Sequence, residues 1–163
     1  MRSISGWTAV LRSFARRLVG SSTFILFLLL ATASLRPACA ADIPSDDEQD
    51  VLVRTTLMTF NDANMTGNYA VLMAKSSKQF QEQISAEKLA TMAEHFRTDK
   101  LFFESIVSED YGFTEKAKID AEGVLFLAGV LKSDEMQVTY KLRFIQSGNV
   151  WKLLGINVNA KKL

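Results

Sequence analysis

The feature that most constrains the fold is a change of periodicity near the middle of the chain. Before it, apolar residues recur at helical spacing, as in the stripe of Leu89, Met92, Ala93 and Phe96, which is typical of a helix buried on one side. After it, apolar and polar residues alternate, most regularly over 136–144, as in a strand with one buried face. Helices followed by antiparallel strands predict an α+β fold in which the helices cover the apolar face of a sheet.

We expect three N-terminal helices packed on a curved antiparallel sheet of four to five strands. The first helix should begin after Ser45, because Ser45 and Glu48 fit a capping box. In the last strand the apolar face changes phase, which predicts a β-bulge near Leu153 to Gly155. The expected helices cover 46–62, 69–76 and 86–97, and the expected strands cover 101–107, 113–119, 124–131, 136–144 and 150–159.

The first forty residues have the order of a secretory signal. Arginines precede the apolar run 24–30, and Ala38-Cys39-Ala40 offers the small residues that a signal peptidase needs. We therefore expect a cleaved signal peptide over residues 1–40 and one domain over residues 41–163, located in the periplasm or secreted. The alternative is an uncleaved anchor, since the charge-free stretch 18–35 is close to the minimum length of a bilayer span.

Removing the leader changes the charge and the cysteine content. The leader holds five of the nineteen Lys and Arg, none of the eighteen Asp and Glu, and the single cysteine, Cys39. The remaining domain therefore has a formal net charge of −4 and no basic run, which predicts no nucleic-acid partner. We also expect no membrane partner after cleavage. With His95 as the single histidine and no cysteine, we expect no metal and no other cofactor.

Several segments carry a resemblance to a known family. The first helix ends in Asn61-Asp62-Ala63-Asn64, Thr66-Gly67-Asn68-Tyr69 leads into the second, and the last strand begins Val150-Trp151-Lys152-Leu153. With the stretch 80–89, they make the chain from Glu48 to Val158 resemble the nuclear transport factor 2-like superfamily, the cystatin-like α+β cone. It is also similar to small exported bacterial proteins of unknown function with this layout. One departure is that no clear strand pair lies between the second and third helices, as it does in some members.

The resemblance implies a curled sheet with a cavity at its open end. The superfamily includes steroid isomerases, dehydratases, polyketide cyclases, transport factors and secretion-system assembly domains. Because these activities share one fold, the resemblance names no activity for this chain.

Polar and aromatic residues of two regions are candidates for a ligand site. Asn64 and Tyr69 belong to an asparagine-rich step between two helices, where the same residue types also serve to end and cap helices without a ligand. Tyr140 and Trp151 lie on the long strands, where cavity walls or a dimer face would be, although aromatic residues there are more often core. The predicted ligand-binding residues are Asn64, Tyr69, Tyr140 and Trp151.

The sequence contains no glycine-rich phosphate loop, no carboxylate pair at catalytic spacing and no His-x-x-x-His arrangement. The leading interpretation is therefore a non-enzymatic exported domain that binds a small apolar ligand, or a protein partner such as a second copy through its sheet. The alternative is a cavity enzyme of the isomerase, dehydratase or cyclase type, with Asp62 or His95 as proton carrier and Tyr69 or Tyr140 as donor. A third interpretation is an envelope assembly subunit that keeps its leader as an anchor.

Overall fold

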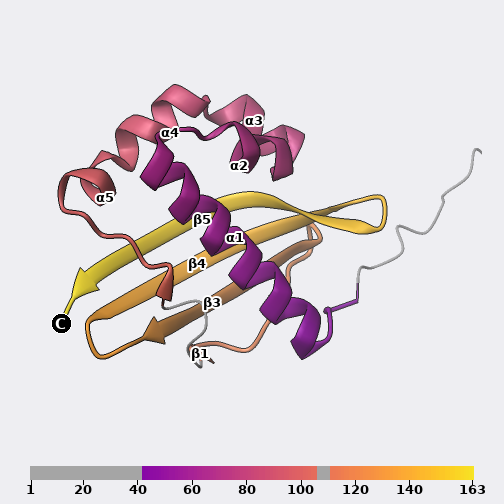
Figure 1. The fold of residues 1–163 in the computed structure, drawn as a ribbon. Coiled ribbons are helices and arrows are strands. Elements are labelled where there is room, and N and C mark those ends of the chain that lie inside the picture. The colour runs from indigo at the N-terminus through magenta and orange to yellow at the C-terminus, as the bar shows by residue number, and fades with distance from the viewer. Residues whose placement is uncertain (1–41, 106–110) are drawn as a thin grey trace, which may run out of the picture. The chain divides into compact units, whose positions relative to one another are not determined.

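A computed structural model describes residues 42–105 and 111–163, and within them helices precede strands (Figure 1). The helices are α1 (Asp46–Thr66), α2 (Ala70–Lys75), α3 (Lys78–Gln83), α4 (Ala86–Met92) and α5 (Glu94–Thr98). The strands form one antiparallel sheet and are β1 (Tyr111–Phe113), β2 (Lys118–Ile119), β3 (Val124–Lys132), β4 (Met136–Ser147) and β5 (Val150–Lys162). The predicted α+β class is confirmed. The predicted signal peptide lies outside the described residues, and among those described no helix is long and apolar enough to cross a membrane.

Helix α1 begins where its capping box predicts. The backbone N–H of Ser45 donates to the Glu48 carboxylate at 2.9 Å, and the Ser45 hydroxyl accepts the N–H of Glu48. The Ser45 N–H and the Ser45 hydroxyl both donate to the Glu48 carboxylate, which favours its charged form and lowers the pKa of Glu48. The helix runs four residues past the expected end at Asp62, because it stops only at Gly67, whose φ of 71° is the left-handed conformation that glycine adopts readily.

The expectation of three helices is wrong, because α3 forms where no helix was expected and the helix expected over 86–97 is divided into α4 and α5. Ser77 separates α2 from α3, where its hydroxyl caps α3 by accepting the N–H of Phe80. The backbone N–H of Ser77 donates to the carbonyl of Leu153 at 2.8 Å, so the break is also tied to the edge of β5. Ala93 forms the turn that separates α4 from α5, and its N–H donates to the carbonyl of Leu89.

The strand expected over 101–107 is absent from its described part, residues 101–105. The side chains of Leu101 and Phe103 are buried as their alternation predicts, but the segment pairs with no strand of the described sheet. Instead the N–H of Phe103 donates to Asn61 Oδ1 in α1 at 2.9 Å. Alternating burial therefore arises here from packing against a helix rather than from a sheet ladder.

Three long strands form the body of the sheet. Its order is β1, β3, β4, β5, and β2 pairs with the same edge of β3 as β1 does, because the strand expected over 113–119 is bent in its middle. The predicted bulge is confirmed: Arg143 lies opposite Gly155 and Phe144 opposite Leu153, which leaves Leu154 as the extra residue. Without that extra residue Leu153 and Ile156 would point to opposite faces.

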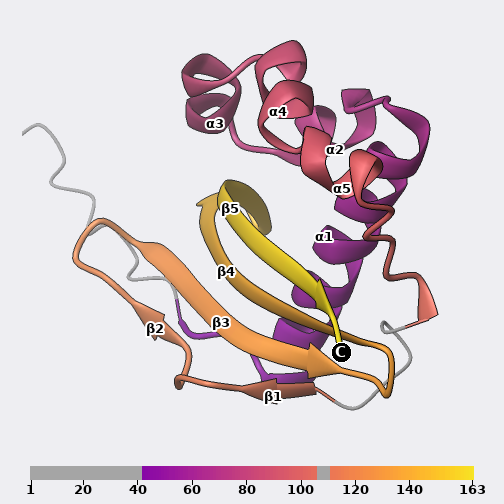
Figure 2. The same ribbon diagram turned by 90° about the vertical axis from the view of Figure 1, so that its left-hand side faces the viewer.

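The helices all lie on one side of the sheet, and β4 and β5 curl at their hairpin end (Figure 2). Directly opposed residues share a face, so the inner face carries cross-strand rows such as Leu125, Phe144 and Leu153. Val53 and Leu57 of α1 are fully buried in the same core. The opposite face of the sheet carries no helix among the described residues.

Candidate functional site

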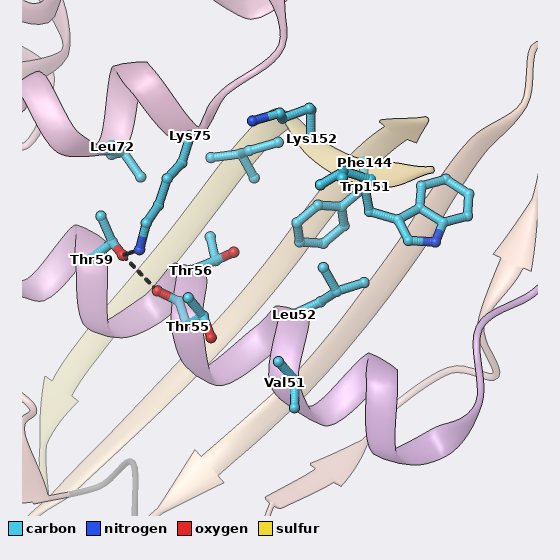
Figure 3. A pocket seen from close by; sticks show the side chains of 12 residues that line it. Val51, Leu52, Thr55, Thr56, Thr59, Leu72, Lys75, Phe144, Trp151 and Lys152 are labelled. Carbon is cyan, nitrogen blue, oxygen red and sulfur yellow. Dashed lines mark hydrogen bonds between the residues drawn. The ribbon is translucent and has the colours of Figure 1, made fainter. Parts of the chain in front are cut away.

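A pocket of about 190 Å³ lies between the N-terminal half of α1, helix α2 and the hairpin end of β4 and β5 (Figure 3). The strands curl away from α1 at this end. Beside the pocket, the N–H of Ser77 donates to the carbonyl of Leu153 in β5. The lining residues come from all four elements: Val51, Leu52, Thr55, Thr56, Thr59, Leu72, Lys75, Phe144, Val150, Trp151, Lys152 and Leu153.

Most of the pocket wall is apolar. Leu52 of α1 and Leu72 of α2 face the strands across the pocket, and Phe144 and Trp151 supply two aromatic rings from the sheet (Figure 3). A cavity of about 150 Å³ lined by Leu, Ile and Phe is large enough to hold benzene. The pocket is therefore large enough for a single ring or a short acyl chain.

One end of the pocket is polar and carries a positive charge. Lys75 Nζ donates to Thr59 Oγ1 at 2.9 Å, and Thr59 Oγ1 donates to the carbonyl of Thr55 at 2.7 Å (Figure 3). Because the Thr59 hydroxyl donates its proton to the Thr55 carbonyl, its oxygen can accept a hydrogen bond from the Lys75 ammonium. Among the described residues no carboxylate lies within 4.0 Å of Lys75. The side chain of Lys152 extends away from the pocket (Figure 3).

The structure separates the four predicted ligand-binding residues. Trp151 is half-buried and lines the pocket. Asn64 and Tyr69 are 0% and 2% exposed; Asn64 lies in the last turn of α1, at the end away from the pocket, and Tyr69 follows that helix. Tyr140 is 0% exposed and belongs to the core on the inner face of the sheet, opposite Gly129 of β3. Only Trp151 of the four is among the lining residues of this pocket.

Asn64 and Tyr69 join Arg97 in a polar network. Tyr69 Oη donates to Asn64 Oδ1 at 2.5 Å, and Arg97 Nη1 donates to Tyr69 Oη at 3.4 Å. Asn64 Nδ2 is buried without a hydrogen-bond partner in the described part of the chain. Burial raises the pKa of the Tyr69 phenol, and the nearby Arg97 guanidinium opposes that rise only in part. The network ties α1 to α5 and has the geometry of a structural contact.

Alkaline pH is expected to destabilise the domain through Tyr69. Its pKa in the folded state lies above the unfolded value of 10.0, so the folded state holds its proton more tightly and stability falls once the pH rises past that value. We expect thermal unfolding between pH 9 and about pH 11 to show a steeper loss of stability in the unsubstituted protein than in Tyr69→Phe. Equal slopes for the two proteins would contradict this prediction.

The two proton carriers of the enzyme interpretation lie on the surface. Asp62 and His95 are both exposed, and the His95 ring packs against Phe96 with 4.3 Å between ring centroids. Neither residue lines the pocket beside Trp151. The phenols that would assist them, Tyr69 and Tyr140, are buried.

Sequence reasoning did not find Thr55, Thr59 and Lys75. The four-residue spacing of the threonines indicates only that they share a helix face, and threonine on a helix face is common. Lys75 reaches Thr59 because α2 folds back on α1, a contact between residues sixteen positions apart. The sequence contains no local signal for that contact.

No protein-family model, no curated protein and no solved structure matches this chain. Any function assigned to the pocket therefore rests on the chain's own residues.

Proposed function

We propose that the protein is an exported, non-enzymatic domain that binds a small apolar molecule with one anionic end in the pocket beside Trp151. The observation that supports this proposal is the combination of an apolar wall with a single inward ammonium, that of Lys75. An apolar ligand gains free energy from the area that it removes from water, and the ammonium favours a carboxylate at one end. Export is proposed from the secretory order of the first forty residues.

The proposal includes the nuclear transport factor 2-like cone as the architecture of the domain. It is supported by a curled sheet with helices on one side and by a pocket at the curled end. In such an arrangement the apolar interior of the sheet continues into the pocket, so a ligand would extend the core rather than lie on the surface.

The proposal is tested with two probes that differ in one group, hexanoate and 1-hexanol. The experiment uses the full chain with the substitution Trp7→Phe, which leaves Trp151 as the only tryptophan. Its fluorescence then measures binding in the pocket that it lines. We expect both probes to change this fluorescence, with dissociation constants of the order of 1 mM for ligands of this size. Hexanoate should bind about fivefold more tightly, because an exposed ion pair contributes up to about 1 kcal/mol.

Two pairs of variants separate the pocket from the rest of the surface. Thr55 is an exposed lining residue, so Thr55→Phe should fill the entrance and abolish binding of both probes, whereas Thr91→Phe on exposed α4 should not. Lys75→Met should remove the preference for hexanoate, whereas Lys78→Met should keep it. Binding that survives Thr55→Phe would refute the pocket as the site.

A further inference from the structure

The face of the sheet that turns away from the helices is strongly basic. We call it the outer sheet face; its cross-strand rows follow from the register of β2, β3, β4 and β5. One row runs Lys118, Phe126, Arg143 and Gly155, and another runs Lys132, Gln137 and Lys161. The cations of the outer sheet face are Lys118, Lys132, Lys141, Arg143, Lys152 and Lys161.

These cations are accessible, and most of them have no carboxylate partner among the described residues. All except the half-buried Lys152 are exposed, and β3, β4 and β5 contain no Asp or Glu. Among the described residues, one carboxylate pairs with the face, that of Glu115 at 3.5 Å from Lys118. The helices have the opposite balance, with eight Asp and Glu against five Lys and Arg. The helices are thus net acidic, whereas the strands are net basic.

Apolar and planar groups lie between the cations. Phe126 is half-buried, with Lys118 Nζ 5.7 Å from its ring centroid. The Arg143 side chain lies over the backbone of Gly155, where a Cβ would meet its Nε at 2.6 Å. Together with Lys141 these residues line a shallow depression of about 510 Å³. Lys118, Lys141 and Arg143 contribute three positive charges to its lining, and Glu115 contributes one negative charge.

The distribution of charge decides which partner fits. A second copy docking this face onto itself by a two-fold axis would bring like charges together, which is unfavourable. An extended acidic segment would bind best to cations arranged in one line. The cations of the outer sheet face are instead spread over four of the five rows that cross β3, β4 and β5, from the row of Lys152 to the row of Lys132. A broad anionic surface meets all of them at once.

We propose that the outer sheet face binds the surface of a bilayer containing anionic phospholipids, peripherally and without a spanning segment. Basic clusters bind such surfaces by attraction to the phosphates, and interleaved apolar groups such as Phe126 contact the boundary of the acyl region. The polarity of the domain orients the sheet toward the membrane. This replaces the expectation of no membrane partner after cleavage of the leader.

The test uses the full chain and maps where lipid protects it. The protein is acetylated at lysine in the presence of phosphatidylglycerol or phosphatidylcholine vesicles, and each lysine is quantified by mass spectrometry. We expect phosphatidylglycerol to slow acetylation of Lys132, Lys141 and Lys161 about threefold or more, whereas Lys78 and Lys88, exposed on α3 and α4, react unchanged. Protection should disappear at about 0.5 M salt, because exposed charges are then screened.

Two double variants each remove two positive charges, one from the outer sheet face and the other from helices α3 and α4. In Lys132→Gln/Lys141→Gln the protection of Lys161 should be lost, and in Lys78→Gln/Lys88→Gln it should be kept. Because the leader is identical in all samples, membrane attachment through the leader alone would protect both sides equally, and that result would overturn the proposal. So would protection of these lysines by polyglutamate but not by phosphatidylglycerol, which would assign the face to an acidic protein.

Discussion

Replacing Gly129 with alanine is expected to destabilise the folded domain by about 3 kcal/mol, at the upper end of the range for overpacking. Gly129 lies on the inner face of β3, opposite Tyr140. A Cβ there would lie 2.5 Å from the carbonyl oxygen of Gly112 and closer still to Tyr140 Oη. Neither neighbour has room to move, because Gly112 is backbone of the paired strand β1 and Tyr140 is 0% exposed.

Thermal unfolding measures this effect, with a fall in Tm of roughly 10 °C expected for a domain of this size. Gly112→Ala is the matched control, since it adds the same methyl group to the adjacent strand where nothing lies within 4 Å of the new Cβ. Gly112→Ala should leave Tm within about 2 °C of the unsubstituted protein. Equal Tm values for the two variants would show that Tyr140 does not pack on Gly129 as described.

Asn61→Ala is expected to destabilise the domain by about 2 kcal/mol. The Asn61 side chain is 0% exposed, and its Oδ1 is the acceptor for the N–H of Phe103. Without the Asn61 amide, the N–H of Phe103 has no acceptor, and it is buried because Phe103 is only 1% exposed. A buried donor without a partner loses the free energy of its hydration and gains no hydrogen bond in return. The segment after α5 should then detach from α1 more readily.

Asn68→Ala is the control, because Asn68 Oδ1 also accepts a backbone N–H, that of Ala70, but in an exposed turn where water can replace it. Its cost should be below about 1 kcal/mol. Hydrogen exchange at the Phe103 amide adds a local measurement, since it should accelerate in Asn61→Ala and stay unchanged in Asn68→Ala. Unchanged exchange in both variants would contradict the role given to Asn61.

Local sequence signals predicted those elements whose causes are local. The capping box at Ser45 depends on residues three positions apart, and the bulge at Leu154 follows from the phase of the apolar residues in one strand. Helix α3 was not expected, and the break at Ala93 was missed because the apolar stripe of 86–97 continues across it. At Ser77 the break is stabilised from outside, by the carbonyl of Leu153.

Three of the four predicted ligand-binding residues lie outside the pocket beside Trp151. Trp151 lines the pocket, and Asn64 and Tyr69 contact each other as their cluster suggested. Their burial, however, makes that contact part of the core. Residue type alone does not distinguish a polar pair that faces a ligand from one that joins two helices, because both need the same donors and acceptors.

The sequence by itself determined the α+β class, the start of α1 and the bulge in β5, since each depends on the pattern of neighbouring residues. Only the tertiary structure decided that Lys75 meets Thr59 and that six cations share one face of the sheet. Along the chain those cations are separated by apolar and neutral residues, so no basic run appears. Strand register brings them together, because residues on neighbouring strands share a face only once the pairing is set.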